Sequence, residues 1–104
     1  MSLETKKIVN MKASLISDNN KHSGIIENLS KDSLYLRAIT INPASDFTPG
    51  EFFEIHFQSH SGEDISLPGK VTWSYDTPPH GLTKSIGIKI QEENPEYDKL
   101  FDEL

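Results

Sequence analysis

A strict alternation of apolar and polar residues runs through "DISLPGKVTWSY", residues 64–75. Side chains of a β-strand point alternately to its two faces, so this period of two predicts a long strand with one buried face. The side expected to be buried carries Ile65, Leu67, Gly69, Val71, Trp73 and Tyr75. On this prediction the aromatic side chains of Trp73 and Tyr75 belong to the core.

Five further segments indicate strands. "FFEIHFQ" and "SIGIKIQ" alternate in the same way, with Phe53, Ile55, Phe57, Ile86, Ile88 and Ile90 inward. Residues 6–17, 22–30 and 33–41 alternate less cleanly but are rich in residues typical of strands. The connections between these segments contain Asn, Asp, Gly and Pro, which favour turns. Six strands with such spacing predict an antiparallel β-barrel or sandwich.

The end of the chain changes its period. Asn94 is a favourable N-cap, and Pro95 suits the first position of a helix. The apolar residues that follow have helical spacing and are Tyr97, Leu100, Phe101 and Leu104. We therefore expect a short C-terminal α-helix whose apolar stripe packs on the open end or the outer face of the barrel.

Size and charge limit the possible functions. The chain has 104 residues, 35% of them hydrophobic, so we expect one domain over residues 4–104. A net charge of −6 argues against binding to a nucleic-acid polymer or an anionic membrane. No segment approaches the roughly 18 apolar residues of a membrane helix, and no secretory leader is evident. We therefore expect a cytoplasmic protein that does not insert into a membrane.

Enzymatic motifs are lacking. The sequence has no glycine-rich phosphate loop, no Gly-x-Ser-x-Gly motif, no His-Glu-x-x-His motif and no cysteine. The four histidines, His22, His56, His60 and His80, are scattered and are expected at the surface without a metal. The acidic C-terminal residues are expected to form a solvated helix face. We therefore expect a binding protein without a cofactor rather than an enzyme.

Two polar side chains are candidates for contact with a partner protein. In "SLYLRAI", Tyr35 and Arg37 alternate with Leu34 and Leu36, so they are expected on the outer face of their strand. Arg37 is also the single arginine of the chain. A site built from two guanidinium groups is therefore excluded.

Four segments, taken in order, resemble the PilZ domain family over nearly the whole chain. They are "GIIENLSKDSLYL", "PGEFFEIHF", "ISLPGKVTWSY" and "SIGIKIQEENPEYDKLFDEL". The family motif in the first segment is Asp or Asn, any residue, Ser, two residues and Gly. Asn28, Ser30 and Ser33 stand at its three defined positions.

The resemblance implies a six-stranded antiparallel PilZ-like β-barrel with a short C-terminal helix. It also implies a role in bacterial cyclic di-GMP signalling, since PilZ domains typically bind this nucleotide and relay its presence to partner proteins. In the family, an Arg-x-x-x-Arg segment before the first strand grips guanine edges and phosphates. The Asn or Asp and the Ser of the motif bond the base, and the Gly allows the ligand to approach the backbone.

The chain departs from this pattern in two places. Ser33 replaces the glycine, and "ETKKIVNMK" supplies Lys6, Lys7 and Lys12 instead of paired arginines. Lysine neutralises a phosphate but lacks the planar fork that pairs with guanine. Each good bidentate contact is worth about 1–3 kcal/mol, so we expect weak or absent binding of cyclic di-GMP.

Three functional hypotheses remain. The first is a regulatory module with a degenerate nucleotide site, which acts mainly through contacts with a protein partner still to be identified. The second is a genuine cyclic di-GMP receptor in which Lys6 and Lys7 replace the arginines. The third is an unrelated OB-like or SH3-like barrel. Independently of these, Asn28 and Ser30 could serve only to stabilise a tight turn.

Overall fold

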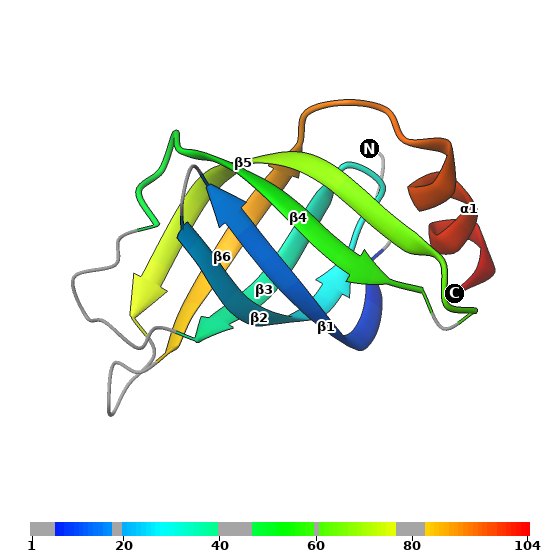
Figure 1. Ribbon diagram of the computed structural model, residues 1–104, viewed down its shortest axis with the longest axis horizontal. Coiled ribbons are helices and arrows are strands. Elements are labelled where there is room, and N and C mark those ends of the chain that lie inside the picture. Colours follow the sequence, from blue (N-terminus) through cyan, green and yellow to red (C-terminus); the bar gives the residue numbers. More distant parts are fainter. Residues whose placement is uncertain (1–5, 18–19, 40–46, 60, 77–82) are drawn as a thin grey trace.

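The computed structural model describes residues 6–17, 20–39, 47–59, 61–76 and 83–104. It contains six strands and one helix: β1 (Lys7–Ser17), β2 (Asn20–Leu29), β3 (Ser33–Ile39), β4 (Phe52–Gln58), β5 (Asp64–Asp76), β6 (Thr83–Ile90) and α1 (Pro95–Glu103). All neighbouring strands are antiparallel, and they close a barrel in the order β1-β2-β3-β6-β5-β4 (Figure 1). The predicted all-β barrel with a short C-terminal helix is confirmed.

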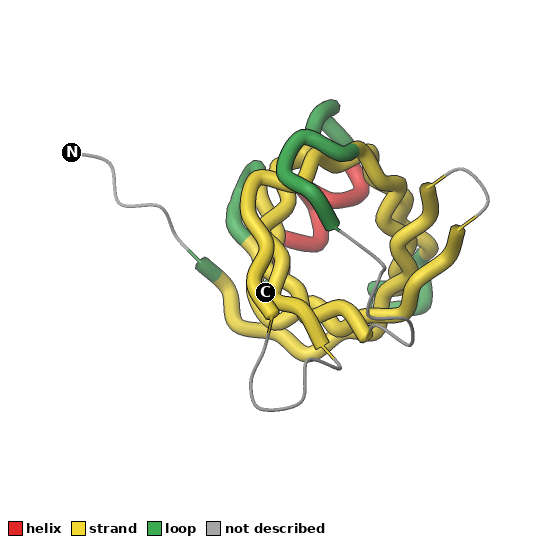
Figure 2. Tube along the Cα trace, turned by 90° about the vertical axis from the view of Figure 1, so that its left-hand side faces the viewer, coloured by secondary structure: helices red, strands yellow, loops and turns green. Residues whose placement is uncertain are grey.

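The inward faces of the strands form one hydrophobic core. Most residues predicted to face inward are buried, among them Phe53, Ile55 and Phe57 on β4, and Ile86 and Ile88 on β6. Ile90, at the end of β6, is only partly buried and packs against the edge of this core. Figure 2 looks along the barrel and shows the ring of strands with the helix behind its far end.

Each end of the barrel is filled by side chains from outside the sheet. At one end, α1 contributes Tyr97 and Leu100, which are both buried in the core. The loop before β4 contributes Phe47, whose ring lies 5.2 Å from that of Phe53 and 4.9 Å from that of His22. Figure 1 shows the described part of this loop at the end away from α1. The expectation that the helix stripe covers an open end of the barrel is confirmed.

The prediction that Trp73 and Tyr75 are core residues is wrong. A β-bulge interrupts β5, because Val71 pairs with Ile88 while Trp73 pairs with the very next residue towards the N-terminus, Gly87. One extra residue on a strand exchanges its inward and outward faces beyond the bulge. As a result Trp73 is only half-buried, and Tyr75 is 66% exposed.

The N-terminus of α1 depends on Asn94. Its Oδ1 accepts hydrogen bonds from the backbone N–H groups of Glu96 (2.9 Å) and Tyr97 (3.1 Å), and its Nδ2 donates to the carbonyl of Ser66 on β5 (3.2 Å). Asn94→Ala removes these bonds, and we expect it to lower the free energy of unfolding by about 0.5–2 kcal/mol in urea denaturation. Asn94→Ser keeps a cap acceptor without setting a carboxylate oxygen against the Ser66 carbonyl, and it should recover much of this loss. Equal losses in the two variants would contradict the role of the cap.

Candidate functional site

One row of residues crosses the outer face of four strands. Asn28 on β2 pairs with Tyr35 on β3, Tyr35 pairs with Gly87 on β6, and Gly87 pairs with Trp73 on β5. The indole of Trp73 covers Gly87 so closely that an added Cβ there would lie 2.2 Å from its Nε1. Glycine is therefore required at position 87 for this packing. The row connects Asn28 of the PilZ-like motif with Trp73, which the bulge in β5 turns to the outer face.

Three aromatic rings form a continuous cluster on this face. The ring centroids of Tyr35 and Trp73 are 5.3 Å apart, and those of Trp73 and Tyr75 are 5.2 Å apart. The hydroxyl of Tyr35 donates a hydrogen bond to Ser85 Oγ (3.2 Å). Aromatic contacts of this kind hold the rings in place while leaving part of their surface open to a partner. Sequence reasoning missed Trp73 and Tyr75 as surface residues.

Arg37 lies beside the aromatic cluster, on the outer face of β3. It pairs across the strands with Ser85, which in turn pairs with Tyr75. Its Nε lies 3.4 Å from Glu27 Oε1, and its side chain is 46% exposed. Tyr35 and Arg37 therefore both point outward, whereas Leu34 and Leu36 are buried.

The turn between β2 and β3 is held by its own serines. The backbone N–H of Ser30 donates to the carbonyl of Ser33 (2.9 Å), and the two hydroxyls form a short hydrogen bond. Ser30 is only 2% exposed. The side chain of Asn28 is half-buried, and its amide has no hydrogen-bond partner among the described residues. Of the three motif residues, Asn28 is thus the one whose polar group is open to a ligand.

The same turn is anchored to α1. The buried hydroxyl of Tyr97 donates a short hydrogen bond to the carbonyl of Ser30, and the N–H of Ile90 donates to the carbonyl of Asp32 (2.8 Å). Burial raises the pKa of the Tyr97 hydroxyl well above its usual range, and the negative charges of Asp32 and Asp98 raise it further. The tyrosine therefore remains a neutral donor at physiological pH.

This raised pKa predicts a loss of stability in alkali. The folded state holds the Tyr97 proton more tightly than the unfolded state, so the contribution is fully present below the unfolded pKa of about 10 and is lost as the pH rises beyond it. We expect the difference in unfolding free energy between the parent and Tyr97→Phe to shrink between about pH 9 and pH 11. Urea denaturation at several pH values would measure it. A difference that stays constant over this range would refute the assignment.

The two N-terminal lysines are in different situations. Lys7 donates from Nζ to the carbonyl of Leu104 (2.7 Å), and its ammonium lies 5.2 Å from the centroid of the Phe101 ring. It is thereby directed towards the helix. Lys6 is exposed, and the following strand places Ile8, which is 90% exposed, directly opposite Asn28. The start of β1 is therefore one of the two segments that flank the amide of Asn28, the other being β3 at Tyr35.

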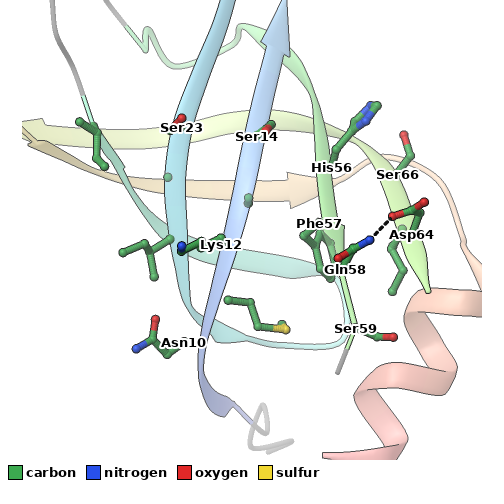
Figure 3. Close-up of a pocket in the computed structure, with 16 residues that line it drawn as sticks. Asn10, Lys12, Ser14, Ser23, His56, Phe57, Gln58, Ser59, Asp64 and Ser66 are labelled. Atoms are coloured by element: carbon green, nitrogen blue, oxygen red, sulfur yellow. Dashed lines mark hydrogen bonds between the residues drawn. The ribbon is translucent and has the colours of Figure 1, made fainter. Parts of the chain in front are cut away.

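A broad groove lined by both polar and apolar side chains crosses β2, β1, β4 and β5 (Figure 3). A row of Ser23, Ser14, His56 and Ser66 forms its floor. Glu54, at the margin of the groove, accepts a hydrogen bond from the hydroxyl of Ser66 (2.6 Å), and its Oε1 lies 2.8 Å from Nε2 of His56. The bond from Ser66 and then the contact with His56 lower the pKa of the Glu54 carboxyl. Lys12 lines this groove, whereas the residues predicted for the ligand motif and the partner surface, such as Asn28 and Tyr35, do not.

The histidines are dispersed over the part of the barrel that is described. His56 is an exposed partner of Glu54, whereas His22 is half-buried against Phe47. His60 and His80 lie outside the described residues. No group of three or more His, Cys, Asp or Glu side chains suited to a metal ion occurs among the residues with described positions.

Comparison with known proteins identifies the fold family. The family model described as the PilZ domain matches residues 8–104. The chain belongs to the PilZ domain family. Because the match is to the PilZ family, the hypothesis of an unrelated OB-like or SH3-like barrel is wrong. PilZ domains are a family of cyclic di-GMP effectors. No curated protein sequence matches the chain significantly.

A solved structure supports the fold of this PilZ domain. The inhibitor of motility MotI/DgrA from Bacillus subtilis superimposes with a TM-score of 0.74 at 9% sequence identity. The match covers 95% of this chain and 46% of the other, so the PilZ domain described here spans about half the length of that protein.

No helix among the described residues is long and apolar enough to cross a membrane.

Proposed function

We propose that this PilZ domain is a regulatory module with a degenerate nucleotide site, which acts mainly through contacts with other proteins. The observation that carries the proposal is the state of the motif serines. The hydroxyl groups of Ser30 and Ser33 bond to each other, and Ser30 is buried. The turn would have to open before the buried Ser30 hydroxyl could reach a nucleotide, and that cost weakens binding.

The cationic groups support the same proposal. The chain has a single arginine, Arg37, which lies beside Glu27. Lys7 is bonded to the carbonyl of Leu104 at the helix end. Of the two lysines proposed to replace the arginines, Lys6 is thus the one whose ammonium is left for a ligand. One ammonium cannot replace two bidentate guanidinium contacts. On this proposal, the exposed side chains around Tyr35 and Arg37 make the contacts with other proteins.

One observation favours the alternative of a genuine cyclic di-GMP receptor. The amide of Asn28 is open, and the exposed Lys6 precedes a strand that runs beside it. A receptor that uses Lys6 and Lys7 would bind electrostatically, so its affinity would fall steeply with salt. Asn28→Ala would abolish such binding.

Fluorescence of Trp73 provides the test, because this residue is the only tryptophan and lies in the same row as Asn28. We expect no saturable change when cyclic di-GMP is added up to about 100 μM at low salt, which corresponds to a binding free energy weaker than roughly −5.5 kcal/mol. Asn28→Ala serves as the matched control for the motif. A saturable change in the parent that disappears with salt and in Asn28→Ala would establish the receptor and overturn the proposal.

A further inference from the structure

The aromatic cluster belongs to a larger outer surface of three adjacent strands, here called the β3-β6-β5 face. It is formed by the outward residues in register with β3: Ser33, Tyr35, Arg37, Ile39, Thr83, Ser85, Gly87, Lys89, Lys70, Trp73 and Tyr75. Two of its apolar side chains are strongly exposed, Tyr75 at 66% and Ile39 at 46%. An exposed cluster of aromatic rings with a further exposed apolar residue on the same face marks an interaction site more often than scattered exposed residues do.

The charge of this face is opposite to that of the whole domain. The chain has 16 acidic and 10 basic residues, yet the three charged members of the face, Arg37, Lys70 and Lys89, are all cationic. Lys70 and Lys89 stand directly opposite each other across β5 and β6. The Lys70 ammonium lies 5.7 Å from the centroid of the Phe52 ring on β4, which carries no charge to balance it. Like charges on opposite residues repel each other, so an anion bound between the two lysines would relieve the repulsion.

The aromatic rings lie between these cations. Lys89 and Lys70 form the row on one side of Tyr35 and Trp73, and Arg37 lies in the row on the other side, level with Tyr75. Glu27, the neighbour of Arg37, lies on β2 and has a buried Oε1 without a hydrogen-bond partner in the described part of the chain. It offsets only one of the three positive charges.

We infer that the β3-β6-β5 face binds an acidic segment of another protein that carries aliphatic side chains among its Asp and Glu residues. The aromatic rings pack against the aliphatic side chains, and the flanking cations form ion pairs with the carboxylates. These ion pairs fix the position of the bound segment, and the same cations repel basic partners. The inference rests on the proposed function, because it assigns a surface and a partner chemistry to the protein contacts. It extends that proposal to Trp73, Tyr75, Lys70 and Lys89.

A peptide selection tests the inference. Random twelve-residue peptides displayed on phage are selected on the immobilised domain, and the enriched peptides are synthesised and titrated by fluorescence polarisation. We expect enrichment of Asp, Glu and aliphatic residues, depletion of Lys and Arg, and affinity that falls with added salt. Enrichment of neutral or basic peptides, or of none, would overturn the inference.

Matched variants locate the binding surface. Tyr75→Ser and Lys89→Glu should each weaken binding of the selected peptides about tenfold or more, that is, by about 1.4 kcal/mol. Their controls lie away from this face: Ile8→Ser, where the apolar side chain is 90% exposed on β1, and Lys99→Glu on α1. The controls should change affinity less than twofold.

The outcomes separate this inference from the proposed function. If peptides bind but respond to Ile8→Ser or Lys99→Glu instead, the contact lies on another face, and the inference fails while a protein-binding role survives. If cyclic di-GMP binds at low micromolar concentration and displaces the peptides, the degenerate nucleotide site is refuted whatever the peptide sequences are.

Discussion

The double variant Lys6→Arg, Asn10→Arg should bind cyclic di-GMP on the order of a hundredfold more tightly than the parent domain. The substitutions recreate the Arg-x-x-x-Arg spacing at the start of β1, next to the strand that carries Asn28. Two bidentate guanidinium contacts are together worth about 2–6 kcal/mol, and every 1.4 kcal/mol is a factor of ten. Both positions are exposed, so the core is not disturbed.

A second pair of positions provides the control for this gain. Lys7→Arg, Met11→Arg has the same spacing, but Lys7 is bonded at the helix end and Met11 packs against the core. We expect this variant to gain little affinity and to lose stability. Calorimetric titration of the two variants would measure the difference. If neither variant binds although both are folded, the missing arginines are not what limits this site.

Tyr97→Ala should lower the free energy of unfolding by about 3–5 kcal/mol, the usual cost of removing a large buried aromatic ring. Tyr97 is 1% exposed, and it connects α1 to the β2–β3 turn through the carbonyl of Ser30. Tyr97→Phe keeps the ring but leaves that carbonyl without its donor, which costs about 1–3 kcal/mol. The two variants together separate packing from hydrogen bonding in a urea denaturation series.

Tyr75→Ala is the matched control, since it removes the same side chain from the surface. Its ring contacts Trp73 but is 66% exposed, so we expect a loss of no more than about 1.5 kcal/mol. A loss for Tyr97→Ala as small as that for Tyr75→Ala would contradict the structural role assigned to the helix. It would also imply that the turn keeps its shape without α1.

The fold was largely predictable because its information is local. Alternation along each strand, turn residues between strands and the capping sequence before α1 each predict an element without knowledge of the others. The side of each strand that faces the core followed in the same way for β3, β4 and β6. These patterns agree with one another, which is typical of a sequence that specifies one fold.

The bulge in β5 was not predictable from alternation alone. The alternation of "DISLPGKVTWSY" continues without a break through Trp73, although Thr72 interrupts the pairing with β6 and its hydroxyl donates to the carbonyl of Gly87 (3.1 Å). The available signal was Gly87 itself, because a glycine inside a strand often marks a place where another group approaches closely. That group is the indole of Trp73.

The state of the candidate site depends on contacts between distant parts of the chain. Lys7 bonds to a carbonyl 97 residues away, and Tyr97 bonds to one 67 residues away. No local pattern predicts such pairs. The motif predicted which residues line the β2–β3 turn, whereas only the structure shows that Ser30 is buried and that the Asn28 amide is open.

The most direct test of the degenerate nucleotide site is a calorimetric titration of the parent domain with cyclic di-GMP at low salt. The proposed function predicts no saturable heat with ligand up to about 100 μM, while circular dichroism confirms that the domain is folded. A saturable heat with one-site stoichiometry, suppressed by salt and lost in Asn28→Ala, would contradict it and would make this PilZ domain a receptor that works without paired arginines.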